Sequence, residues 1–90
     1  MSIRLKVGPN FLGDGKVIPL VMEVSGSTVG DCLEKLMLQE PEFEQKAFEE
    51  AGKPKSTTSI TINRVPVLAR PLQKAVKDGD EIEITYTPPG

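Results

Sequence analysis

The sequence contains no histidine, no tryptophan and only one cysteine in 90 residues. A single cysteine excludes an internal disulfide, and without histidine it cannot build the ligand cage of a zinc site. The chain also has no glycine-rich phosphate loop and no nucleophile paired with a base. We therefore expect a protein that holds no metal or cofactor and is not itself an enzyme.

A strong charge of either sign and a long apolar run are also missing. Eleven basic against thirteen acidic residues leave a net charge of -2, which gives no long-range attraction to nucleic acids or anionic membranes. The opening stretch MSIRLKVGPN has no apolar signal-peptide core. No run reaches the roughly 18 apolar residues of a membrane-spanning helix. We expect a cytoplasmic protein that binds neither nucleic acid nor membranes.

The sequence does contain enough apolar residues for one small core. The apolar content is 38%, and a chain of 90 residues is long enough for a single domain that folds alone. We expect this domain to span residues 1–86 and a flexible tail to span residues 87–90.

Two segments near the start alternate between apolar and polar residues, as half-buried strands do. They cover residues 3–7 and 18–24, and the breaker-rich segment 8–15 between them predicts a hairpin with a long connection. Val17 and Val21 lie on the face of the second strand that would otherwise be solvated. We interpret them, with Val67, as candidate partner-binding residues, although a small sheet also exposes some apolar residues without purpose.

A helix is predicted to begin after Thr28, because Thr28 and Asp31 have the spacing of a capping box. Its apolar stripe is Val29, Cys32, Leu33, Leu36 and Met37. The helix should end by Glu40, since Pro41 disfavours helical dihedrals in the residue before it. Helical spacing then predicts a second, shorter helical segment over residues 43–52. Cys32 is interpreted as a buried core residue, with a sulfur-accepting or redox thiol as the alternative.

The second half alternates polar connectors with short strands. Residues 53–59 form a polar connector, residues 59–63 a strand, Asn63-Arg64 a turn, and the stretch VPVL a short return. A single helical turn is predicted at Pro71-Leu72, and Asp78-Gly79-Asp80 should form a tight turn before the last strand, which ends at Tyr86. The acidic residues Glu40, Glu42, Glu44, Glu49 and Glu50 predict a solvated face.

This order of elements predicts an α+β fold, one mixed sheet packed on one main helix. The first and last strands can be adjacent and parallel, because the helix lies between them as a crossover. That is the order of the ubiquitin-like β-grasp fold.

Three stretches in this order resemble the MoaD/ThiS sulfur-carrier family of ubiquitin-like proteins: GSTVGDCLEKL, ITINRVPV and VKDGDEIEI. The resemblance extends from Ile3 to Gly90. The insert from Pro41 to Gly52 makes the chain most similar to the molybdopterin synthase small-subunit type, because carriers of the thiamine type are usually shorter.

The resemblance implies a chemistry at the chain end. In the family, an E1-like adenylyltransferase activates the terminal glycine carboxylate, sulfur replaces AMP to give a thiocarboxylate, and a sulfur-acceptor synthase subunit receives it. Gly90 matches the terminal glycine, whereas Pro89 replaces the penultimate one. Thr87, Pro88 and Pro89 would form an extended tail. A non-conjugating interaction module and a ubiquitin-like protein modifier are the alternative functions.

Overall fold

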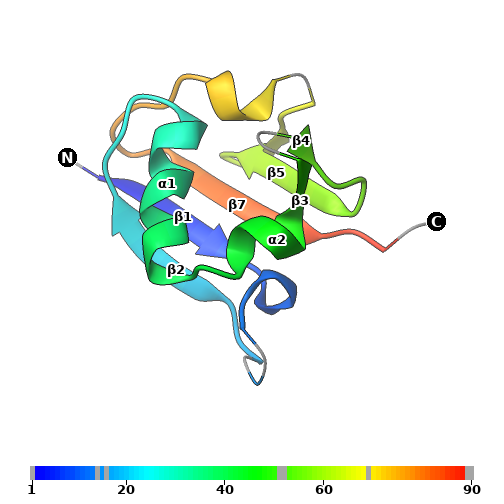
Figure 1. Cartoon of the computed structure of the whole chain (residues 1–90). Helices are drawn as coiled ribbons and strands as arrows, with labels where there is room; N and C mark the ends of the chain where they lie inside the picture. Colours follow the sequence, from blue (N-terminus) through cyan, green and yellow to red (C-terminus); the bar gives the residue numbers. More distant parts are fainter. Residues whose placement is uncertain (1, 14, 16, 51–52, 69, 89–90) are drawn as a thin grey trace.

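The structure, a computed structural model, describes residues 2–13, 15, 17–50, 53–68 and 70–88. Its centre is a five-stranded mixed sheet in the order β2-β1-β7-β5-β6 (Figure 1). The strands are β1 (Ile3–Val7), β2 (Leu20–Val24), β5 (Thr58–Ile62), β6 (Val65–Pro66) and β7 (Glu81–Tyr86). β1 and β7 run parallel, and the other neighbouring pairs are antiparallel.

Helix α1 (Val29–Gln39) covers one face of this sheet (Figure 1). The inward positions of the three central strands are almost fully buried; they are Ile3, Leu5, Val7, Ile60, Ile82 and Ile84. They share one core with Val29, Cys32, Leu33 and Leu36 of α1. The predicted fold class is confirmed: the chain has the ubiquitin-like β-grasp fold.

The predicted start of α1 is confirmed by its cap. Thr28 Oγ1 accepts a hydrogen bond from the Asp31 backbone N–H at 3.2 Å, and Asp31 Oδ2 accepts one from the Thr28 N–H at 3.2 Å. The helix ends at Gln39, one residue before Glu40. Cys32 is fully buried, as expected for a core residue. Burial, and secondly the charge of Asp31, raise the pKa of its thiol.

The second strand is shorter than predicted. β2 begins at Leu20 and not at residue 18, and the Ile18 side chain is 71% exposed. The reason lies in the partner strand. Val7 pairs with Leu20, and directly afterwards Pro9 opens the 3-10 turn η1 (Pro9–Phe11), so nothing continues β1 for residues 18–19 to pair with.

The prediction of a helical segment over residues 43–52 was wrong for residues 48–50, and its residues 51–52 lie outside the described residues. Helix α2 (Phe43–Ala47) ends where β3 (Phe48–Glu50) begins, and β3 pairs with β4 (Lys53–Pro54), inside the predicted connector. In a helix, Phe43 and Phe48 would point about 140° apart. The extended backbone at Phe48 lets both rings reach the core, where their centroids lie 6.0 Å apart.

The remaining elements follow the prediction closely. The short return is β6, and the predicted single turn is the 3-10 helix η2 (Pro71–Gln73). Gly79 adopts φ 90° in the turn before β7, a conformation that glycine accepts without strain. β5 begins at Thr58, one residue earlier than expected.

Candidate functional site

The tail leaves from the centre of the sheet. β7 lies between β1 and β5, and the Thr87 N–H donates to the Thr57 carbonyl at 2.7 Å, one position beyond the end of the strand. Pro88 has no N–H, so the ladder cannot continue through it. Thr87 and Pro88 are exposed, and the chain runs outward from the end of β7 at this point (Figure 1). The start of the tail is therefore held by the sheet and open to solvent.

The reactive end predicted from the sequence is not part of this geometry. Pro89 and Gly90 lie outside the described residues. Of the four tail residues, the structure places only Thr87 and Pro88, and the role of the Gly90 carboxylate stays a prediction.

A hydrogen-bonded clamp holds the other end of β7. Asn63 Nδ2 donates to Asp80 Oδ1 at 3.0 Å, the Lys77 N–H donates to Asp80 Oδ2 at 2.9 Å, and the Glu81 N–H donates to Asn63 Oδ1 at 2.9 Å. The hydrogen bond from Asn63, then that from Lys77, lowers the pKa of the Asp80 carboxyl. Because the clamp joins the turn after β5 to the start of β7, it fixes the register of the strand that carries the tail.

The sequence interpretation found only part of this clamp. It identified Asp80 as a turn residue, but not that Asn63 would bond to it. Asn63 itself was the signal that could have indicated this bond. A two-residue hairpin turn needs left-handed backbone, which asparagine tolerates, and the asparagine side chain offers both a donor and an acceptor.

The sheet face opposite α1 carries compensated charges. The Arg4 guanidinium lies 3.7 Å from the Glu23 carboxylate and 4.0 Å from that of Glu81, and the Lys6 ammonium lies 3.8 Å from the Glu83 carboxylate. All of these side chains are partly exposed, so each ion pair contributes little to stability. This face offers a partner a polar surface with little net charge.

The acidic residues predicted to form a solvated face lie around α2 and β3. Glu42, Glu44 and Glu49 are exposed and Glu40 is half-buried, while the side chain of Glu50 is not described. The Glu49 carboxylate lies 3.9 Å from the Lys53 ammonium. The cation that pairs with Glu49 thus lies on the same hairpin and not on a partner protein.

The three candidate partner-binding valines do not form one patch. Val17 is 82% exposed and lies before edge strand β2, whereas Val21 is 54% exposed and lies within it. Val67 is half-buried and follows β6, at the opposite edge of the sheet. Their binding roles stay predictions, and any partner would meet them as two separate surfaces.

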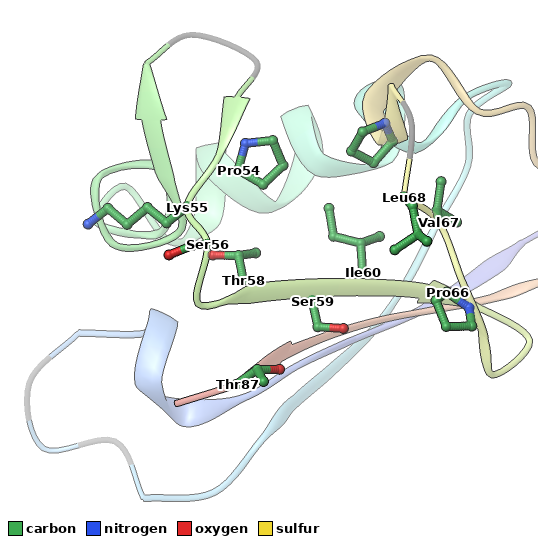
Figure 2. A pocket seen from close by; sticks show the side chains of 11 residues that line it. Pro54, Lys55, Ser56, Thr58, Ser59, Ile60, Pro66, Val67, Leu68 and Thr87 are labelled. Carbon is green, nitrogen blue, oxygen red and sulfur yellow. The ribbon is translucent and has the colours of Figure 1, made fainter. Parts of the chain in front are cut away.

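A groove lies along the β6 side of the sheet, next to the tail. Its volume is about 390 Å³, and Thr87 is one of its lining residues. We call it the proline groove and define it by Pro54, Lys55, Ile60, Pro66, Leu68 and Pro71. Thr58 and Ile60 project from β5 between Pro54 on one side and Leu68 on the other, while Ser59 and Thr87 lie on the far side of the strand (Figure 2). Sequence analysis named two of its lining residues, Val67 as a partner-binding candidate and Thr87 as part of the tail, but did not predict the groove.

Two classes of site are missing from the part of the chain that the structure describes. It contains no group of three or more residues able to hold a metal ion. Within the same residues, no helix has the length and apolar character needed to cross a membrane.

Comparisons of the sequence with known proteins identify no family: no protein-family model matches it, and no curated protein does. Solved structures do match. SAMP1 from Haloferax volcanii superposes with a TM-score of 0.73 at 23% identity, covering 100% of this chain and 99% of its own. Mycobacterium tuberculosis CysO gives 0.70 at 23% identity, covering 92% and 98%. A chain of the Amycolatopsis orientalis BexX/CysO complex gives 0.70 at 22% identity, covering 96% and 98%. These proteins share the fold of the chain over nearly its whole length.

Proposed function

We propose that this chain is a cytoplasmic, non-catalytic sulfur carrier that bears sulfur on the carboxylate of Gly90. An E1-like adenylyltransferase activates that carboxylate, and a synthase subunit accepts the sulfur, in molybdopterin biosynthesis. The observation that carries the proposal is the exposed tail at Thr87-Pro88, which continues directly from the central strand of a β-grasp sheet. A carrier needs this combination, because its acyl group must enter another protein's active site while its body remains folded.

The proposed chemistry takes place in two balanced steps. A carboxylate oxygen of Gly90 attacks the α-phosphorus of ATP, and pyrophosphate leaves. A hydrosulfide ion then attacks the acyl carbon, AMP leaves, and the resulting thioacid loses its proton to give the thiocarboxylate. The body of this chain supplies no catalytic group to either step. Its contribution is to present a tail whose two prolines lack the N–H groups needed to pair with a strand.

The similar structures support a role in protein binding. One of them was solved as the BexX/CysO complex, so a protein of this fold binds a partner there. The sequence resemblance to sulfur carriers supplies the specific reaction, with Gly90 at the position of the reactive glycine.

Intact-mass spectrometry tests the proposal. The chain is incubated with an E1-like enzyme, ATP and a sulfide donor, and replacement of one oxygen by sulfur should add about 16 Da. A variant that lacks Gly90 should show no gain. Pro89→Gly should keep activation within about tenfold, because the added backbone freedom costs only about 1 kcal/mol to order.

A different pattern would identify a non-conjugating interaction module. In that case the wild-type chain gains no mass with any E1-like enzyme tested, and Pro89→Gly restores a measurable gain. That result would mean that Pro89 blocks the reaction, and it would refute the sulfur-carrier proposal.

A ubiquitin-like protein modifier is the second candidate function. The name of one similar protein favours it, since SAMP1 is a small archaeal modifier protein. A modifier needs the same activation, but a lysine amine then attacks the Gly90 acyl carbon and AMP leaves, which forms an isopeptide bond. Incubation with a cell extract separates the two functions, because only a modifier yields conjugates whose tryptic peptides carry the tail on a lysine.

A further inference from the structure

We infer that the outer edge of β2 binds the same edge of a second copy of this chain. The two strands run antiparallel with a two-fold axis at Met22, so the two sheets join into one. Three features of β2 lead to this dimer: its unprotected edge, the directions of its backbone groups, and the apolar side chains beside them. Neither copy needs the chemistry of Gly90 to associate.

The two edge strands of the sheet, β2 and β6, differ in how well they are protected. β6 is two residues long and contains Pro66. β2 pairs with β1 over five consecutive residues, and no described segment pairs with its outer edge (Figure 1). Its five side chains include one charge, on Glu23, and Val21 is exposed. A regular, mostly apolar edge of this kind is a template for another strand.

The backbone of β2 presents two residues to this edge. The Arg4 N–H donates to the carbonyl of the residue before β7 at 3.0 Å, so Arg4 turns its backbone toward β7. Successive residues of a strand bond to opposite neighbours, so Leu5 bonds to β2, where it is opposite Met22. Val21 and Glu23 therefore turn their N–H and carbonyl groups outward. In the described part of the chain, no hydrogen bond is made to these four groups.

One antiparallel register satisfies all four groups. With Met22 on the two-fold axis, Val21 of each copy is opposite Glu23 of the other, and the two pairs exchange four backbone hydrogen bonds. An axis at Val21 would instead place the Glu23 carbonyl opposite Pro19, which has no N–H. An axis at Glu23 would place two carboxylates directly opposite each other. Backbone and charge thus select an axis at Met22.

The same register brings apolar side chains together on the sheet face that α1 covers. Met22 faces Met22 of the second copy, and Leu20 faces Val24. Leu20 and Met22 are half-buried, so a single copy leaves part of each in water. A groove of about 370 Å³ lies here, and its lining includes Met22, Val24 and Lys35. Leu20 of the second copy enters this groove, and the two-fold axis repeats the contact. One edge thus carries both the groove and the side chain that fills it, as an interface between identical copies requires.

This pairing leaves both tails accessible. β2 is two strands away from β7, which carries the tail, so neither tail lies at the interface. Because β7 is parallel to β1 and the two copies run antiparallel, the tails leave the joined sheet at opposite ends. Each copy in the dimer keeps its exposed Thr87-Pro88 segment.

Sedimentation equilibrium and amide hydrogen exchange of the full-length chain test the dimer. Between about 10 µM and about 1 mM chain, the mass should rise from the 9.8 kDa of one copy toward twice that value. Over the same range, exchange measured by NMR should slow at the Val21 and Glu23 amides, which point to solvent in a single copy. A mass that stays at 9.8 kDa up to about 1 mM, or a dimer in which these two amides stay unprotected, overturns the inference.

Opposite charges at position 22 test the register. Met22→Lys places two ammonium groups opposite each other at the axis, and Met22→Glu does the same with two carboxylates. Each variant alone should therefore associate at least about tenfold more weakly than wild type. An equal mixture of the two should associate again, since a lysine then faces a glutamate. Val65→Lys is the matched control, because it places a lysine at an exposed residue of β6, the other edge strand, and should leave association unchanged.

Two outcomes contradict an axis at Met22: undiminished association of both single variants, or a mixture that associates no better than either variant alone. An equal loss in Val65→Lys would place the interface elsewhere. Circular dichroism checks that each variant is folded, since Met22 is half-buried. The hydrogen-exchange measurement uses the wild-type chain, so it decides the inference even if a Met22 variant fails to fold.

Discussion

At the scale of single residues, the turn between β5 and β6 contains two residues other than glycine with left-handed backbone. Asn63 and Arg64 have φ of 52° and 69°, the left-handed backbone of a two-residue hairpin turn. The contacts of its side chain explain the asparagine at position 63, since it donates a hydrogen bond to Asp80 and accepts one from the Glu81 N–H. No described contact explains an arginine at position 64, where glycine would fit without strain.

We therefore expect Arg64→Gly to raise the free energy of unfolding by about 1 kcal/mol, measured by urea denaturation. Asn63→Gly is the matched control. It relieves the same backbone strain, but it removes both side-chain hydrogen bonds of the clamp, so it should destabilise the chain. Destabilisation by Arg64→Gly would show that the arginine side chain contributes more to stability than its backbone costs.

The Asp80 carboxyl makes the stability of the fold depend on pH. Its pKa is lowered in the folded state from the ordinary value of 3.8, chiefly by the Asn63 hydrogen bond. A lowered folded-state pKa means that the contribution of this group is present above pH 3.8 and is lost as pH falls through the folded-state pKa.

Asp80→Asn should lower the melting temperature at pH 7, because its NH₂ group would face one of two donors, either Asn63 Nδ2 or the Lys77 N–H. As pH falls from 3.8 through the lowered folded-state pKa, the difference in melting temperature from wild type should shrink, since wild-type Asp80 becomes protonated in the folded chain as well. Thermal unfolding followed by circular dichroism between pH 7 and pH 2 measures it. A difference independent of pH would show that the Asp80 charge is not what stabilises the clamp.

At the scale of elements, helix α1 depends on its first turn. Thr28 Oγ1 and Asp31 Oδ2 satisfy N–H groups that the helix itself leaves without partners. Thr28→Ala should cost about 1 kcal/mol of unfolding free energy. Ser27→Ala is the control, because Ser27 contributes only its backbone N–H to Asp31 and should change stability far less. Equal losses in urea denaturation would contradict a capping role for the Thr28 hydroxyl.

The elements that could be predicted were those with a local signal. The alternation in β1, β5 and β7 and the stripe of α1 follow directly from which side chains are buried. The β3–β4 hairpin could not be predicted, because Phe43, Ala47 and Ala51 have the i, i+4, i+8 spacing of a helix. The edge-to-face contacts of Phe43 with Phe11 and Phe48 decide the conformation, and two of these rings lie in different elements from Phe43.

At the scale of the whole molecule, the tail could be proposed from the sequence and the groove could not. Consecutive residues make the tail, so the prolines and glycine were visible in the sequence. The proline groove instead brings together Pro54, Ile60, Pro66, Leu68 and Pro71, which meet only after β5 has paired with β6. The apolar stretch VPVL indicated a short return strand, and in the structure its Val65 and Leu68 side chains are largely exposed.

The folded body and the tail should therefore be separable by mutation. Ile84 is fully buried on β7 between β1 and β5, so Ile84→Ala should cost about 2–5 kcal/mol of unfolding free energy. Removal of Pro89 and Gly90 should change that free energy by less than about 0.5 kcal/mol, because among the described residues the last hydrogen bond of the ladder is made at Thr87 and Pro88 is exposed. The same truncation should abolish the mass gain expected of a sulfur carrier, whereas the portion of Ile84→Ala that remains folded should still be activated. If urea denaturation showed that truncation destabilises the chain as much as Ile84→Ala does, the last two residues would belong to the folded body and not to a free tail.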